Sequence, residues 1–128
     1  MQDKNKDLSQ YRLSNANETF DVANDCFANG HYRDAINRSY YAAFYAAKAV
    51  LALDEIDFKR HKDVIAYFNK EFVATEKISR EIGKKLARLQ QKREKSDYDD
   101  FFIASQDEAS SQIEAAKDII NAITEYLK

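Results

Sequence analysis

The sequence of 128 residues contains no proline and only two glycines. Because the turns of sheet proteins draw on both residue types, this scarcity argues against a β-fold and favours a chain built from helices. The hydrophobic fraction of 45% and the charged fraction of 33% suit amphipathic helices that bury one face, and not a disordered chain. We therefore expect an all-α protein with a single helical domain over residues 1–128, whose core covers about residues 8–127.

Cysteine and histidine are also scarce. Cys26 is the single cysteine, so no disulfide can form within the chain, and this is compatible with a reducing compartment. His31 and His61 are the only histidines, and no Cys/His set has metal-ligand spacing, so neither a metal nor a cofactor is expected. The polar start "MQDKNKDLSQ" lacks the apolar centre of a signal peptide. No run approaches the ~20 apolar residues that a membrane span needs. These features predict a cytoplasmic protein without a membrane contact.

Apolar residues recur at spacings of 3 and 4, which predicts five helical segments. They cover about residues 8–29, 31–53, 61–73 and 79–95, and a last segment that begins after Ser105. Gly30 follows the first segment where a terminating glycine is expected. Ser105 and Glu108 form a Ser-x-x-Glu capping box before the last one.

The second segment, which includes "INRSYYAAFYAAKAV", is apolar on nearly every side between Ala42 and Leu53. Such a helix is expected at the centre of a bundle, or covered by a second protomer. Its more polar residues follow a second line, in which the first two form an i,i+4 pair. This line suits the polar wall of a cleft, a dimer interface, or an arginine that only orders the bundle. Its members are Asp34, Arg38, Tyr41, Tyr45 and Lys48.

The net charge of −2 is unevenly distributed: residues 1–58 carry −3, residues 59–95 carry +7 and residues 96–128 carry −6. Either the helices attract one another within the fold, or the basic middle is a strip that binds phosphates. A basic row with spacings of 4, 4 and 3 lies off the apolar face of the fourth segment. This row is either a solvated face or a contact for RNA backbone through counterion release. It consists of Lys84, Arg88, Lys92 and Lys95.

Arg93 continues the apolar stripe of the fourth segment, after Ile82, Leu86 and Leu89. A buried arginine is costly unless its guanidinium is paired. Two interpretations stay open: a salt bridge to a carboxylate such as Asp97, or an arginine that faces a phosphate in a groove.

The segment "SDYDDF", residues 96–101, follows directly. Its structural interpretation is a polar loop in which Tyr98 and Phe101 turn inward. A metal site here is weakly supported, because the adjacent Asp99 and Asp100 need not converge.

Three stretches, "GHYRDAINRSYYAAFYAAKAVL", "HKDVIAYFNKEFV" and "REKSDYDDF", resemble the small stand-alone prokaryotic HEPN domains (higher eukaryotes and prokaryotes nucleotide-binding). The resemblance covers about residues 13–126. It implies a five-helix up-and-down bundle that forms a homodimer, with a cleft between the protomers. It also implies a toxin–antitoxin or defence setting, because many members are ribonucleases encoded beside a minimal nucleotidyltransferase.

In those ribonucleases an arginine is followed, after four to six residues, by a histidine. The resemblance implies that both promote attack of a ribose 2′-OH on the adjacent phosphate without a metal. Here Arg93 matches the arginine, but no histidine follows within reach. Enzymatic activity therefore stays open, with Asp97, Tyr98 or the distant His61 as candidate partners of Arg93.

Three functional hypotheses follow. The first is a dimeric module that binds the phosphate of a nucleotide or of RNA, or a nucleotidyltransferase partner. The second is a metal-independent ribonuclease toxin that uses Arg93 with Asp97 or His61. The third is a scaffold that binds only another protein. The candidate binding residues of the first hypothesis are Arg38, Tyr41, Tyr45, Lys84, Arg88, Lys92, Arg93 and Tyr98.

Overall fold

A computed structural model describes residues 2–128, and this part of the chain contains five α-helices and no strand. The helices are α1 (Gln2–Ala28), α2 (Tyr32–Leu53), α3 (His61–Phe68), α4 (Arg80–Tyr98) and α5 (Gln106–Tyr126). A π-helical segment, η1 (Asn69–Val73), directly continues α3. The all-α prediction is confirmed. The largest differences are that α1 begins earlier than expected and that α4 continues to Tyr98.

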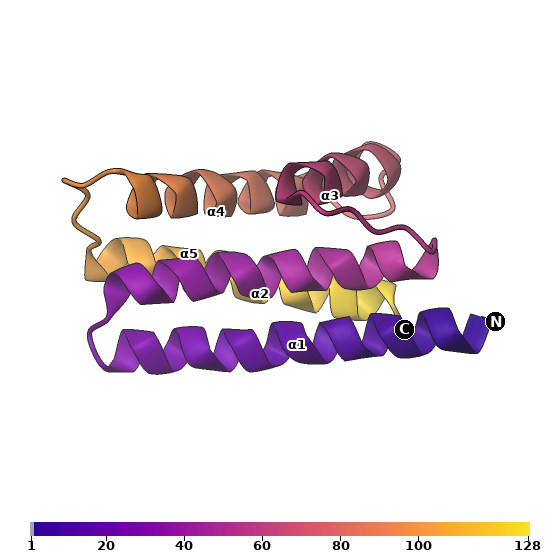
Figure 1. The fold of residues 1–128 in the computed structure, drawn as a ribbon, viewed down its shortest axis with the longest axis horizontal. Helices are drawn as coiled ribbons and strands as arrows, with labels where there is room; N and C mark the ends of the chain where they lie inside the picture. The colour runs from indigo at the N-terminus through magenta and orange to yellow at the C-terminus, as the bar shows by residue number, and fades with distance from the viewer. Residues whose placement is uncertain (1) are drawn as a thin grey trace.

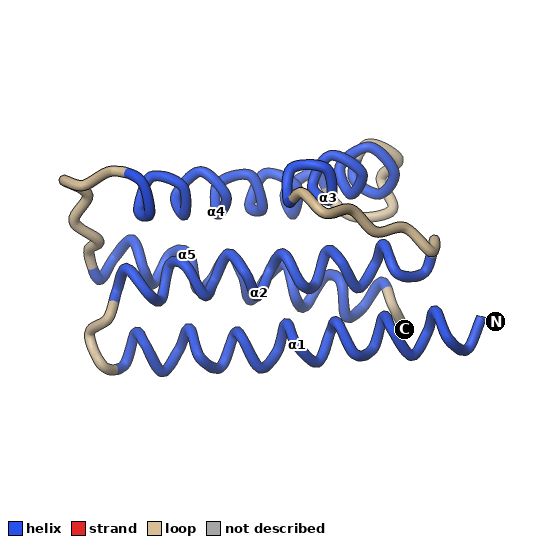
Figure 2. The backbone as a smooth tube through the Cα atoms, viewed as in Figure 1, coloured by secondary structure: helices blue, strands red, loops and turns tan. Residues whose placement is uncertain are grey.

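The four long helices run alternately up and down along the long axis of the molecule (Figure 1). Both ends of the chain lie at the same end of the bundle, and α3 lies across that end, above the last turns of α2 (Figure 1). The connections are short except for the two segments that flank α3 and η1 and the loop between α4 and α5 (Figure 2).

Helix α2 is central, because it packs against α1, α3, α4 and α5. Thirteen of its 22 residues are buried, seven of them alanines whose small side chains let the neighbouring backbones approach closely. This confirms the prediction of a central helix. It also means that one chain accounts for the burial of α2, so the apolar composition of this helix is not evidence for a second protomer.

The helix ends follow local sequence signals. Gly30 adopts a φ of +78° after α1, and the amide of His31 donates to the carbonyl of Cys26 at 2.8 Å, which closes the helix end. Ser105 and Glu108 form the expected capping box at the start of α5. At the start of α4, the hydroxyl of Ser79 accepts from the amide of Glu81 at 3.1 Å. These ends therefore depend on contacts between neighbours in the sequence.

Part of the uneven charge distribution along the chain is explained by ion pairs between helices. Lys85 pairs with Asp118 at 2.6 Å and Lys92 pairs with Glu108 at 2.9 Å, so the basic α4 is joined to the acidic α5. Within residues 2–128, no helix is long and apolar enough to cross a membrane.

Candidate functional site

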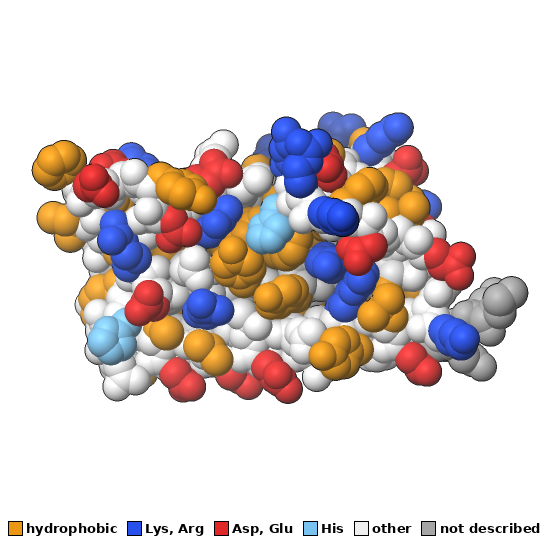
Figure 3. All heavy atoms as spheres, in the orientation of Figure 1, with side chains coloured by type: hydrophobic (Ala, Val, Ile, Leu, Met, Phe, Trp, Pro, Cys, Tyr) orange, Lys and Arg blue, Asp and Glu red, His pale blue; other side chains and the backbone are white. Residues whose placement is uncertain are grey.

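Arg93, near the end of α4, lies against the aromatic face of α2. Its guanidinium carbon is 4.8 Å from the ring centroid of Tyr40 and 5.7 Å from that of Tyr41. Cations at these distances are attracted to the faces of aromatic rings. We call Tyr40, Tyr41, Phe44, His61 and Arg93 the tyrosine–arginine cluster. Figure 3 shows hydrophobic side chains in the middle of this face, over α2, with Lys and Arg side chains beside them.

The polar partners of Arg93 are few and distant. Its side chain is 13% exposed and pairs with Asp97 through Nη1 and Oδ2 at 3.5 Å, at the outer limit of a hydrogen bond. Its buried Nε has no hydrogen-bond partner among residues that the structure describes. Asp97 also accepts from the amide of Asn37, at 3.4 Å. The pair with Asp97, one of the two interpretations left open by the sequence, is therefore present, but it uses little of the five-donor capacity of a guanidinium.

His61, the first residue of α3, belongs to the same cluster although it is far from Arg93 in the sequence. Its ring stacks on Phe44 with centroids 4.1 Å apart, and its Nδ1 lies 3.2 Å from the hydroxyl of Tyr40. Tyr41 meets the same ring edge-on at 5.6 Å. The other ring nitrogen, Nε2, has no hydrogen-bond partner among the described residues. The fold thus brings together a histidine and an arginine that the sequence separates.

The electrostatic surroundings keep His61 neutral. Burial lowers the pKa of His61 below its usual value of 6.5, and the positive charges of Arg93 and Lys48 lower this pKa further. Burial raises the pKa of Tyr40 to about 12, and the charge of Arg93 only partly opposes that rise. At neutral pH, therefore, Tyr40 keeps its proton and His61 is an uncharged imidazole that is able to accept one.

Tyr98 and Phe101 do not turn inward, so that interpretation of the "SDYDDF" segment is wrong. Tyr98 is 77% exposed and Phe101 is 92% exposed, together with Ile103 at 86%. The next aromatic residue, Phe102, is half-buried and packs against a small group of buried residues that includes Ile36 and Ile113. Hydrophobic side chains are visible at this end of the bundle in Figure 3. Tyr98 therefore presents its ring to solvent, one helical turn and a half beyond Arg93.

The polar line of α2 is only partly as expected. Tyr41 and Tyr45 are half-buried, with ring centroids 6.2 Å apart, and they extend the cluster along the helix. The expected Asp34–Arg38 ion pair is absent, although both residues lie in the described part of the chain. Instead, the guanidinium carbon of Arg38 lies 5.9 Å from the Tyr41 ring. Arg38 is therefore a second cation on the same aromatic surface.

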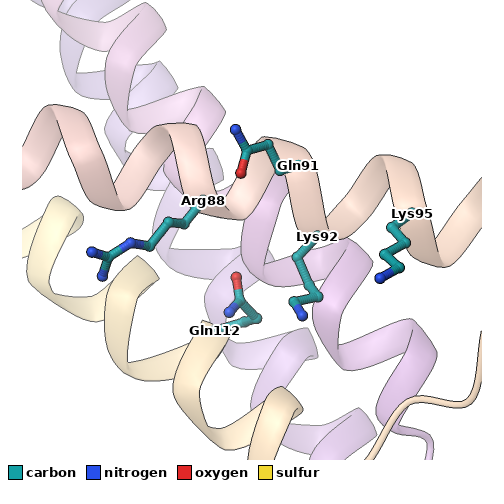
Figure 4. Close-up of a pocket in the computed structure, with 5 residues that line it drawn as sticks. All are labelled: Arg88, Gln91, Lys92, Lys95 and Gln112. Atoms are coloured by element: carbon teal, nitrogen blue, oxygen red, sulfur yellow. The ribbon is translucent and has the colours of Figure 1, made fainter.

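The basic row of α4 divides into two parts. Arg88, Lys92 and Lys95 line a hollow of about 380 Å³ between α4 and α5 (Figure 4). Lys84 pairs with Glu81 at 3.8 Å and lines a separate groove. Because Arg93 contacts α2 whereas Lys92 pairs with Glu108 on α5, the hollow and the tyrosine–arginine cluster lie on different sides of α4.

In the part of the chain that the structure describes, no three His, Cys, Asp or Glu residues gather to hold a metal ion. Two residues with a role in these arrangements were not singled out from the sequence. Tyr40 is a buried residue of α2, and its hydroxyl, which needs a hydrogen-bond partner when it is buried, was the signal in the sequence. Gln112 lies on the buried side of α5, between Ala109 and Ile113. A polar residue on an otherwise apolar helix face was the signal that its amide needs a hydrogen-bond partner.

Comparison with known proteins gives a consistent result. The HEPN domain profile matches residues 9–126. A UPF0332 protein of Thermotoga maritima is 32% identical over 128 residues, which cover 100% of this chain and 96% of that protein. Two proteins of Methanocaldococcus jannaschii that carry the name "Putative toxin" are also similar. One is 34% identical over 127 residues, covering 97% of this chain and 94% of that protein. The other is 27% identical over 115 residues, covering 90% and 78%.

Proposed function

This chain belongs to the HEPN domain family, and from that premise we propose that it is a dimeric module that binds the phosphate groups of RNA or of a nucleotide. The proposed setting is a toxin–antitoxin or defence pair with a minimal nucleotidyltransferase. The names of the two archaeal relatives support the toxin part of this setting. The pairing with a nucleotidyltransferase is supported by the resemblance of the sequence motifs.

The observation that carries the proposal is that the guanidinium of Arg93 is held in place but only weakly paired with a carboxylate. Two tyrosine rings hold its guanidinium, while its contact with Asp97, at 3.5 Å, is longer than the ~2.7–2.9 Å of a strong charge-assisted hydrogen bond. A phosphate offers two oxygens in the geometry that a guanidinium prefers. Because the Asp97 side chain is 27% exposed, it can turn to water when a phosphate takes its place.

Neighbouring side chains are suited to the rest of such a ligand. Arg38 adds a second positive charge beside Tyr41. The exposed ring of Tyr98 offers a face on which a base can stack, an interaction that does not depend on sequence. Tyr41 and Tyr45 present half-buried aromatic edges along α2. A nucleotide bound at Arg93 would therefore meet both cationic and aromatic groups.

The proposal of a dimer rests on the loop between α4 and α5. Tyr98, Phe101 and Ile103 expose large apolar side chains close together in the sequence, and a second copy of the chain would remove them from water. Tyr98 lies five residues beyond Arg93, roughly 7.5 Å along the helix axis. A dimer formed through this end would therefore bring two copies of Arg93 to one cleft.

A second candidate function, a metal-independent ribonuclease, is favoured by the position of His61. With the Nδ1 proton directed to the Tyr40 oxygen, the lone pair on Nε2 would accept the proton of a ribose 2′-OH. The 2′-oxygen would then bond to phosphorus, the bond from phosphorus to the 5′-oxygen would break, and that oxygen would take a proton from water. Arg93 would stabilise the charge on the phosphate oxygens.

One experiment separates the candidates. Single-stranded RNA is incubated in EDTA with the wild-type protein, with Arg93→Gln and with His61→Asn, and both RNA integrity and RNA binding are measured. The binding module predicts intact RNA and binding that weakens at least about ten-fold in Arg93→Gln. Cleavage that both substitutions abolish would favour the ribonuclease.

A melting curve for each variant shows that it is folded. If Arg93→Gln is folded and binds RNA as tightly as the wild type, and the RNA stays intact, the role proposed for Arg93 in phosphate binding is wrong. If the wild-type protein itself neither binds nor cleaves RNA, the third hypothesis, a protein-binding scaffold, is the better one.

A further inference from the structure

The hollow between α4 and α5 has the size and the lining of a ligand site. Its volume of about 380 Å³ lies within the ~300–1,000 Å³ range of small-molecule pockets. It is lined by Arg88, Gln91, Lys92 and Lys95 of α4 and by Gln112 of α5, and Figure 4 shows Lys92 and Lys95 on the side of α4 that faces Gln112. The amide of Gln112 lies between Arg88 and Lys92 in this view (Figure 4). Polar groups from both helices thus converge on one space.

Two of the three cations in the hollow are not neutralised. Lys92 pairs with Glu108 at 2.9 Å, and its hydrogen bond is the main reason that the pKa of Glu108 is lowered, which burial partly opposes. Glu108 is therefore charged at neutral pH and compensates Lys92. Arg88 and Lys95 form no ion pair with any residue that the structure describes. The hollow thus has an excess positive charge that suits an anion.

Gln112 gives the second, independent observation. It is only 8% exposed, and its buried Oε1 has no hydrogen-bond partner in the described part of the chain. An apolar residue at this position would pack beside Ile113 without leaving a polar atom unpaired, whereas a lone buried acceptor lowers stability. A ligand that carries a hydroxyl or N–H donor would satisfy this atom.

We propose that the hollow is a second phosphate site, one that holds a ribonucleotide, either free or as one residue of an RNA strand. The phosphate lies between Arg88 and Lys95, and a ribose hydroxyl or a base N–H donates to Gln112. A ribonucleotide carries the anion and the donor in one molecule, which is what the two observations require. This inference rests on the proposed function for its ligand class, but it uses the side of α4 that faces away from Arg93.

The test uses the full chain, with AMP, inorganic phosphate and a short oligoadenylate as probes, in calorimetric titrations. Arg88→Gln combined with Lys95→Gln is expected to weaken binding of AMP or of oligoadenylate at least about ten-fold. For oligoadenylate, the slope of log affinity against log salt concentration should fall by about 1.4 for the two lost cations. The matched control combines Lys6→Gln with Lys117→Gln, two exposed lysines outside the hollow, and should change affinity less than about two-fold.

Gln112→Leu tests the role of the amide separately from the charge. If Gln112 contacts the ligand, the leucine variant should bind AMP about five-fold more weakly while its melting temperature stays the same or rises. Weaker binding of AMP alone would identify a free nucleotide, and weaker binding of oligoadenylate would identify an RNA residue; both results support the site. Unchanged affinity for AMP and oligoadenylate in the Arg88/Lys95 double variant, or an equal loss in the Lys6/Lys117 control, would overturn it.

Arg93→Gln separates this inference from the proposed function. If Arg93→Gln loses oligoadenylate binding and the hollow variants keep it, the hollow is not a site and the proposed function stands. If the hollow variants lose binding and Arg93→Gln keeps it, the hollow is the site and the role proposed for Arg93 is wrong.

Discussion

Replacement of Arg93 by glutamine measures how firmly the tyrosine–arginine cluster holds this side chain. A cation stacked on aromatic rings contributes about 0.5–2 kcal/mol, and a distance of 4.8 Å to Tyr40 with 13% exposure places Arg93 in the upper half of that range. The i,i+4 pair with Asp97 at 3.5 Å adds about 0.3–0.5 kcal/mol. Removal of the unpaired Nε offsets part of this loss. We expect the free energy of unfolding to fall by about 1–2 kcal/mol, measured by urea denaturation.

The pKa of His61 reports on the same contact. Because the charge of Arg93 lowers the pKa of His61, Arg93→Gln should raise it. The pKa should still stay below 6.5, since burial, the largest cause of the shift, and Lys48 both remain. Arg93→Lys keeps the charge but not the planar guanidinium, so it should reduce stability and leave the pKa of His61 nearly unchanged. NMR titration of the imidazole resonances measures both variants.

A matched control is Arg60→Gln. Arg60 directly precedes α3, is 67% exposed and pairs with Asp63 at 3.1 Å, so its replacement should change stability by less than about 0.5 kcal/mol. If Arg93→Gln costs no more than this control and the His61 titration does not move, Arg93 is not held on Tyr40. The proposal that Arg93 is positioned for a phosphate would then lose its physical basis.

Two further predictions concern His61 and the exposed loop. Because the pKa of His61 is lowered in the folded state, the unfolded chain binds more protons, and the free energy of unfolding should fall as pH decreases from about 6.5 towards the folded-state pKa. His61→Asn should flatten this pH dependence, measured by urea denaturation between pH 5.5 and 7.5. An unchanged slope in the variant would contradict the burial of His61. Phe101→Ser combined with Ile103→Ser should shift sedimentation towards the monomer. Because both side chains are exposed in the single chain, the melting temperature should stay unchanged when it is measured at concentrations low enough for the wild type to be monomeric. Wild-type protein that sediments as a monomer at all concentrations would rule out the dimer.

The fold was largely predictable because its signals are local. The spacing of apolar residues, the absence of proline, Gly30 after α1 and the capping box at Ser105 each act within one or two helical turns. The end of α4 was harder to predict from the sequence, because the buried stripe continues through Ser96, a polar residue that gives no apolar signal, and the helix ends only at Tyr98. Helix ends are the least certain part of such a prediction when no apolar residue marks them.

The candidate site was predictable only in part. Arg93 was identified because it continues an apolar stripe, and the structure confirms both its partial burial and the pair with Asp97. The predicted orientation of Tyr98 and Phe101 was wrong. The path of the loop decides which aromatic side chain packs inward, and that side chain is Phe102. The division of the basic row into two parts was not predictable either. Lys84 pairs within α4 whereas Lys92 pairs with Glu108, and only the position of α5 in the fold produces this difference.

The sequence by itself determined that the chain is helical, where most helices begin and end, and which side chains share one face of each helix. Only the tertiary structure decided that His61 meets Tyr40, that Arg93 lies over the same ring, and that Gln112 faces Arg88 across a hollow. The physical reason is that helical periodicity acts over three or four residues, whereas the meeting of two faces depends on how helices far apart in the chain pack together.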